Sequence, residues 1–167
     1  MTLYFRRIEP EYWLDDPPAW LDPDDVEGRQ ISDLSYRMKT NTISVYALPD
    51  AGASTLTRVC AAMVATRQRV EDITYFVFDD ALLQRASVQI DKTVGATGDP
   101  AVDEWHRDLV RIAGTSLVRL ARELRNCDAL RTLKEDIESE LVFALGTEKR
   151  YPHPPQIAAH LRKKALI

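Results

Sequence analysis

The chain has 167 residues, of which 45% are hydrophobic and 29% charged, and its formal net charge is −4. This length predicts one domain, residues 1–167, that buries most of its apolar surface without disulfides or metals. The apolar runs are too short for a transmembrane helix, and the start of the chain lacks the apolar core of a signal peptide. The sequence therefore argues against a membrane protein and predicts a cytoplasmic one.

The two cysteines predict neither a disulfide nor a metal site. Cys60 and Cys127 both lie in apolar helical patterns, which favours buried free thiols in a reducing compartment. No cysteine or histidine stands at ligand spacing from either of them, so we expect no bound metal and no cofactor.

The first predicted strand, Leu3–Ile8, is stopped by Pro10, and a segment of different character follows. Residues 9–27 contain four prolines and many carboxylates but no Lys or Arg, which predicts irregular structure. Two interpretations of its aromatic residues stay open. They pin a loop to its own domain, or they form an acidic and aromatic patch that binds a partner protein. The aromatic residues concerned are Tyr12, Trp13 and Trp20.

The centre of the chain predicts a β-α-β unit. Alternating apolar residues indicate a strand over 41–48, and a helix over 55–68 follows with Ser54 as its candidate N-cap. The segment 73–78 is almost continuously apolar and aromatic, as expected for a strand covered on both faces. Short connections between these elements predict a right-handed crossover if the two strands are parallel neighbours.

Shorter elements follow this unit. We expect a helical turn over 81–85 capped by Asp80, a strand over 87–91, and a loop over 93–98. Asp99 followed by a proline then predicts the start of a helix.

The segment 101–126 fits one helix or two helices, and residues 105–112 also fit a strand, so these alternatives stay open. Further helices are predicted from Asp128 to Gly146 and over 156–164. The predicted fold is α+β: a small mixed β-sheet of about four strands, with one β-α-β unit, packed against a helical C-terminal half.

One set of residues suggests catalysis. Asp79 and Asp80 follow the apolar strand, and His106 lies further along the chain. Carboxylates at a strand end together with an imidazole suffice for general base chemistry. They would make the protein a small hydrolase or a nucleotide-processing enzyme. The interpretation that the sequence favours is a pair of turn carboxylates and a surface or partly buried histidine.

Two further motifs depart from the chemistry they resemble. A metal-dependent nuclease needs a carboxylate where Ile90 stands, two residues before Lys92. The glycines of the loop 93–98 suggest a phosphate cradle, but Asp99 would repel phosphate there. A plain turn fits this loop better.

Basic residues concentrate in the last part of the chain, where residues 105–167 carry twelve bases and eight acids, whereas residues 1–52 carry ten acids and five bases. A cationic helix face would suit an acidic protein surface, and more weakly a nucleic acid, since few aromatic residues for base stacking lie nearby. It is also what an ordinary solvated helix presents. The arginines singled out as partner-binding are Arg107, Arg111, Arg119 and Arg122.

These patterns favour a non-enzymatic protein–protein interaction subunit or adaptor of a larger bacterial-type system. Its contact surfaces would be the acidic, aromatic segment and the basic helical face, and self-association through these opposite patches is a further option. The small enzyme that uses Asp79, Asp80 and His106 is the alternative.

Overall fold

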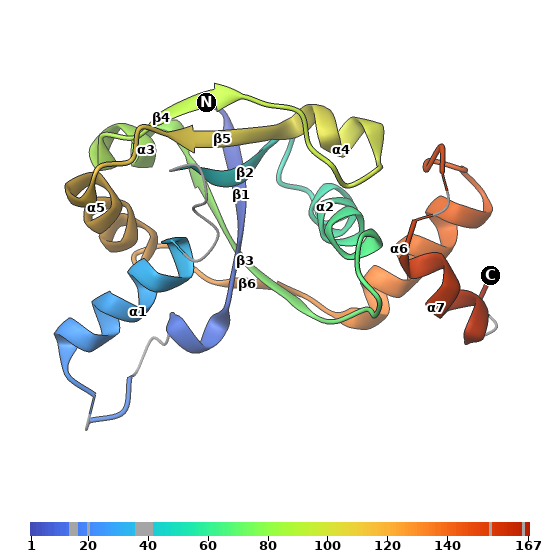
Figure 1. The fold of residues 1–167 in the computed structure, drawn as a ribbon, viewed down its shortest axis with the longest axis horizontal. Coiled ribbons are helices and arrows are strands. Elements are labelled where there is room, and N and C mark those ends of the chain that lie inside the picture. The colour runs from blue at the N-terminus through green and yellow to red at the C-terminus, as the bar shows by residue number, and fades with distance from the viewer. Residues whose placement is uncertain (14–16, 20, 36–41, 154, 165) are drawn as a thin grey trace.

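A computed structural model describes residues 1–13, 17–19, 21–35, 42–153, 155–164 and 166–167. Its centre is one open sheet with helices on both faces (Figure 1). Within the described residues the strand order is β4-β5-β2-β1-β3-β6, and every neighbouring pair is antiparallel. The strands are β1 (Leu3–Ile8), β2 (Ile43–Leu48), β3 (Ile73–Asp79), β4 (Gln89–Lys92), β5 (His106–Val110) and β6 (Leu130–Thr132).

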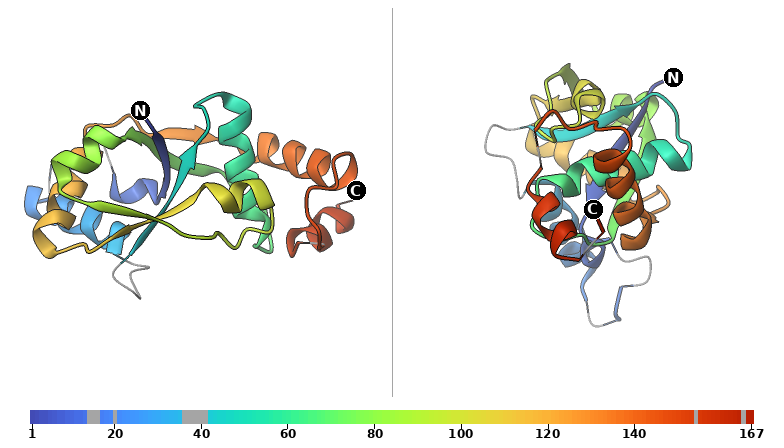
Figure 2. Two further views of the ribbon diagram at one scale, coloured as in Figure 1. Left: turned by 90° about the horizontal axis from the view of Figure 1, so that it is seen from above. Right: turned by 90° about the vertical axis from the view of Figure 1, so that its right-hand side faces the viewer.

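The helices divide between the two faces of the sheet. One face carries the 3-10 helix η1 (Pro10–Tyr12), α1 (Pro23–Ser35), α3 (Asp80–Ala86) and α5 (Gly114–Leu124). The other face carries α2 (Ala53–Ala65), α4 (Pro100–Trp105), α6 (Lys134–Gly146) and α7 (Ile157–Lys163). Figure 2 shows α6 and α7 beyond α2, at the end of the molecule that holds the C-terminus.

Apolar side chains on alternate positions of the central strands explain why both faces are covered. In β1, Phe5 points into one core, and Tyr4 and Ile8 into the other. In β3, Tyr75 points into the same core as Phe5, and Phe76 into the other. Strands buried on both faces carry nearly continuous apolar runs, as the sequence of β3 predicts.

The β-α-β unit is present, but its two strands are not neighbours. Both β2 and β3 pair antiparallel with β1, so they run parallel to one another with β1 between them. The prediction of a mixed sheet is therefore wrong for the neighbouring pairs. The first strand of the chain takes a central position, which no local pattern in 41–78 reveals.

The sheet has six strands in the described residues instead of about four. One addition, β5, confirms the strand alternative for 105–112. The other, β6, lies inside the segment predicted as one helix from Asp128 to Gly146. It has only three residues, too few to show a period of two, and the exposed Leu130 and Leu133 fit a helical spacing instead.

The predicted irregular segment ends earlier than expected, because α1 begins at Pro23. Proline suits the first position of a helix, where its missing N–H would have no intrahelical partner. Asp22 Oδ1 accepts a hydrogen bond from the Asp24 amide at 2.9 Å, and Asp24 and Asp25 lie in the first turn. Acidic residues in the first turn interact favourably with the helix dipole, so these carboxylates stabilise the start of α1.

Two predicted helix caps are displaced by one or two residues. The N-cap of α2 is Gly52 and not Ser54, and that of α3 is Asp79 and not Asp80. The predicted cap at Asp99 is confirmed, since its side chain accepts hydrogen bonds from the amides of Ala101 and Val102. Among the helices that the structure describes, none is long and apolar enough to span a bilayer.

Candidate binding cleft

The two sides of β1 pair to different extents. Its ladder with β3 covers all six residues, from Leu3 to Ile8. Its ladder with β2 stops after Phe5, which pairs with Tyr46. The same register would bring Arg7 opposite Ser44, but the two strands part before that point. The sheet therefore forks between the end of β1 and the start of β2.

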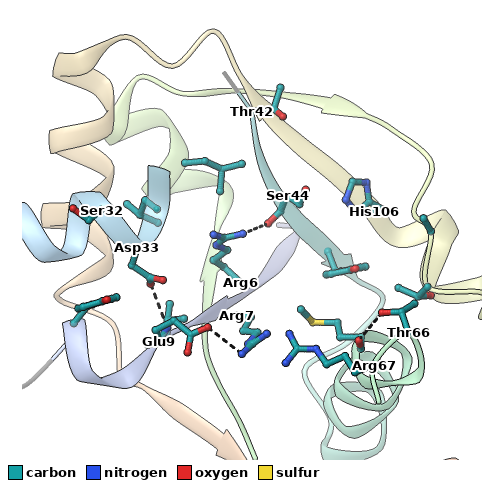
Figure 3. Close-up of a pocket in the computed structure, with 18 of the residues that line it drawn as sticks. Arg6, Arg7, Glu9, Ser32, Asp33, Thr42, Ser44, Thr66, Arg67 and His106 are labelled. Carbon is teal, nitrogen blue, oxygen red and sulfur yellow. Dashed lines mark hydrogen bonds and ion pairs between the residues drawn. The ribbon is translucent and has the colours of Figure 1, made fainter. Parts of the chain in front are cut away.

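A cavity of about 870 Å³ opens at this fork (Figure 3). Because the strands part, its lining comes from both faces of the sheet. Tyr46 and Met63 belong to one core and Ile8 to the other. One wall is formed by η1 and α1, the opposite wall by the end of α2 and by β5. The volume lies within the range of small-molecule and cofactor sites.

Among the described residues, three guanidinium groups line the cleft. Arg6 and Arg7 are consecutive residues of β1, and Arg67 follows the end of α2. Arg6 reaches across the fork, where its Nη1 donates to the backbone oxygen of Ser44 at 3.0 Å. Figure 3 shows Arg7 and Arg67 side by side at the α2 corner of the cleft.

The guanidinium groups of Arg7 and Arg67 meet at one carboxylate oxygen. Arg7 Nη2 donates to Glu71 Oε1 at 3.4 Å, and Arg67 Nη1 donates to the same atom. Arg7 Nη2 also donates to Glu9 Oε1 at 3.0 Å. The two cations therefore already form an anion position, and the protein's own carboxylate occupies it.

The opposite wall of the cleft is acidic and structurally braced. Asp33, which is 8% exposed, accepts hydrogen bonds from Trp13 Nε1 at 2.6 Å and from the Glu9 amide at 3.3 Å. Glu11 and Tyr12 lie on the same wall. The Asp33 carboxylate thus ties η1 to α1 and fixes the side of the cleft.

Trp13 belongs to one of the two apolar cores. It is 7% exposed, and its ring meets that of Phe76 edge-on with centroids 4.9 Å apart. Its apolar area is thus mostly buried within the chain, and its role in partner binding stays a prediction. Tyr12 is half-buried on the cleft wall. The other tryptophan, Trp20, lies outside the described residues.

The two aspartates after β3 hold backbone groups. Asp79 Oδ1 accepts from the Leu82 amide at 3.1 Å and caps α3. Asp80 accepts from the Thr2 amide and from the Tyr4 hydroxyl, both at 2.7 Å. The bond from the Thr2 amide is the main cause that lowers the pKa of Asp80. Burial, helped by Asp80, raises the pKa of Tyr4 to about 12.

His106 lies elsewhere, on the β5 side of the cleft. Its Nδ1 is 2.8 Å from Thr93 Oγ1, and its Nε2 is 4.0 Å from Asp108 Oδ1. The structure therefore does not bring His106 together with Asp79 and Asp80, neither of which lines the cleft. Within the described residues, no group of three or more His, Cys, Asp or Glu side chains is placed to hold a metal ion.

The glycine loop 93–98 is closed by a protein carboxylate. Asp103 accepts from the Thr97 amide and hydroxyl, each at 2.7 Å, and from the Gly98 amide at 3.1 Å. Backbone amides that could cradle a phosphate are thus turned toward this aspartate. The loop is the plain turn that its sequence favoured.

The predicted cationic face is largely tied to its own chain. Arg107 donates to the backbone oxygens of Glu104 and His106, and Arg119 to Ser87 Oγ. Arg122 makes a two-pronged ion pair with Glu27, at 2.8 and 3.1 Å. Arg111 is exposed, in a left-handed backbone conformation with φ 54°. These arginines line no part of the cleft.

Comparison with protein-family models finds no match, and neither the curated proteins nor the solved structures give one. The geometry of the cleft is thus the main guide to function.

Proposed function

We propose that the protein is a cytoplasmic, non-enzymatic interaction subunit that holds a segment of a partner protein in the cleft between β1 and β2. The observation that carries this proposal is the fork itself. A break in the ladder of a central strand exposes polar side chains inside an otherwise apolar sheet. The resulting cavity of about 870 Å³ is lined by Arg6, Arg7 and Arg67 among the described residues.

The composition of the cleft fits a polypeptide ligand. Arg6, Arg7 and Arg67 offer charged donors that are planar and suited to carboxylates and phosphates. Tyr12 and Met63 add an aromatic ring and a flexible thioether on opposite walls. Aromatic residues, Met and Arg are enriched in protein interfaces. The acidic, aromatic segment thus contributes a wall of the site, through residues 9–12.

The alternative enzyme draws less support from the same geometry. Its two aspartates stabilise the start of α3 and the N-terminal strand. His106 lies on β5, which β2 and β1 separate from β3 in the sheet. A nucleic-acid partner is also less favoured, because Glu27 balances Arg122 on the basic face. A second copy of this chain is one form that the partner can take.

A photo-crosslinking experiment tests the proposal. A photoreactive amino acid replaces Thr66, an exposed residue that lines the cleft, and in a control variant it replaces Gln84, an exposed residue of α3. The full chain is irradiated in cells of its native host, and adducts are identified by mass spectrometry. We expect one defined protein adduct from position 66, none from position 84, and loss of that adduct when Tyr12→Ala is added. Identical adducts from both positions, or none from position 66, would contradict the proposal.

A further inference from the structure

The anion position between Arg7 and Arg67 identifies the group that the cleft recognises. Resting on the proposed function, we propose that this position takes a phosphoryl group carried by a side chain of the partner, which replaces the carboxylate of Glu71. The protein would then be a reader of phosphorylated segments.

The first argument is convergence. Arg7 and Arg67 lie on different elements, the central strand and the end of α2, yet both donate to one oxygen of Glu71. Two guanidinium groups that donate to a single atom are well placed to bind an anion with several acceptor oxygens. A phosphoryl group has three such oxygens and carries a charge close to −2 at neutral pH.

The second argument is the unequal anchoring of the groups. Arg7 stands on a fully paired edge of β1, and its side chain is only 13% exposed. Glu71 stands on the connection between α2 and β3, outside any helix or strand, and its side chain is 33% exposed. The cations are therefore held in place, while the carboxylate between them can be displaced toward solvent.

Glu71 acts in this proposal as an internal competitor. Its carboxylate offsets the mutual repulsion of the two arginines when no ligand is bound, and a ligand must compete with it for their donors. Removal of its charge should therefore strengthen phosphate binding. A merely structural ion pair predicts the opposite, since its loss would only loosen the site.

The test uses the purified full chain and three probes: a degenerate phosphoserine and phosphotyrosine peptide library, the same library without phosphate, and free O-phosphoserine. Binding is measured by fluorescence anisotropy and calorimetry. We expect phosphorylated peptides to bind at least about tenfold more tightly than either other probe. Arg67→Gln should weaken this binding about tenfold, Glu71→Gln should strengthen it about threefold, and Arg69→Gln, an exposed arginine of the same connection, should leave it unchanged.

Other outcomes separate the two proposals. Equal affinity for phosphorylated and unphosphorylated peptides overturns the phosphoryl inference and leaves the binding function standing. Equal affinity for free O-phosphoserine overturns the partner protein as its source. Weaker binding in Glu71→Gln overturns the competitor role. If that variant fails to fold, Arg67→Lys is tested in its place. Lysine lacks the planar fork of arginine, so full affinity in this variant would overturn the proposed geometry.

Discussion

The two edges of strand β1 differ in how far they pair with their neighbouring strands. Toward β3 the strand pairs along its whole length, and the side chains around this ladder form the two apolar cores. Toward β2 it pairs over three residues and then parts, and arginines occupy the opening. One strand thus takes part in both apolar cores and in the lining of the cleft. We call the β3 side of β1 the closed side and the β2 side the open side. Substitutions on the closed side should lower stability, whereas substitutions on the open side should weaken binding.

The largest expected effect falls on the closed side, at Trp13. Trp13→Ala removes a buried ring that packs on Phe76 of β3 and leaves Asp33 without its indole donor. We expect the free energy of unfolding to fall by about 3–5 kcal/mol, measured by urea denaturation. Trp13→Phe should lose less. A variant that keeps its stability but no longer captures a partner would contradict this role and indicate that Trp13 contacts the partner.

A smaller but still large effect is expected at Asp99, which anchors α4 to α2. Its fully buried carboxylate accepts from Arg58 Nε at 2.9 Å and Nη2 at 2.7 Å. Asp99→Asn leaves this guanidinium without its ionic partner, which should cost about 3 kcal/mol in the same denaturation measurement. Asp91→Asn, on an exposed edge-strand position, is the matched control. Equal losses in both variants would contradict the role of the buried pair.

Alkaline pH should weaken the closed side next. Burial raises the pKa of Tyr4 and of Cys60 to about 12, and burial also raises the pKa of Tyr75 and Tyr151. The folded chain therefore retains protons that the unfolded chain releases, so this contribution is complete below the ordinary pKa of cysteine, 9.0, and is lost as pH rises toward 12.

The urea midpoint should accordingly fall steadily above pH 9, while tyrosinate absorbance of the folded protein lags behind that of the unfolded chain. A midpoint that stays constant across this interval would show that these groups are not protected from ionisation.

The smallest effect is expected at Arg122, on the face that the sequence offered as a contact surface. Its ion pair with Glu27 joins α5 to α1 but is exposed to solvent. Exposed pairs contribute little and are screened by salt. Arg122→Gln should change the urea midpoint only slightly and leave partner capture intact. Loss of capture with unchanged stability would move the binding surface from the cleft to this face.

Much of the fold follows from local pattern. The apolar alternation of β1 and β2 and the continuous run of β3 predict their strands, and Asp99 with its proline predicts the start of α4. The number of strands does not follow, because β6 is too short to show a period. The sequence does not predict the start of helix α1, because Pro23 lies in a segment whose four prolines favour irregular structure, although proline at the first helical position is favourable.

The cleft could not be predicted because it depends on where a ladder stops. Arg7 and Arg67 are sixty positions apart in the sequence, and they meet only because α2 crosses over β1. One sequence feature does point to the site. Two consecutive arginines stand in a strand whose other residues are apolar, and a strand covered on both faces has no ordinary place for both. A fork in the sheet resolves this conflict.

The most direct test of the central claim is a heteronuclear NMR titration of the full chain with the tightest peptide of the library, phosphorylated or not. If the open side of β1 is the recognition surface, backbone amide shifts should concentrate at Arg6, Arg7, Ser44 and Arg67, while those of β6 and α5 stay in place. Shifts confined to α5, or to the start of α3 around Asp79 and Asp80, would contradict the account.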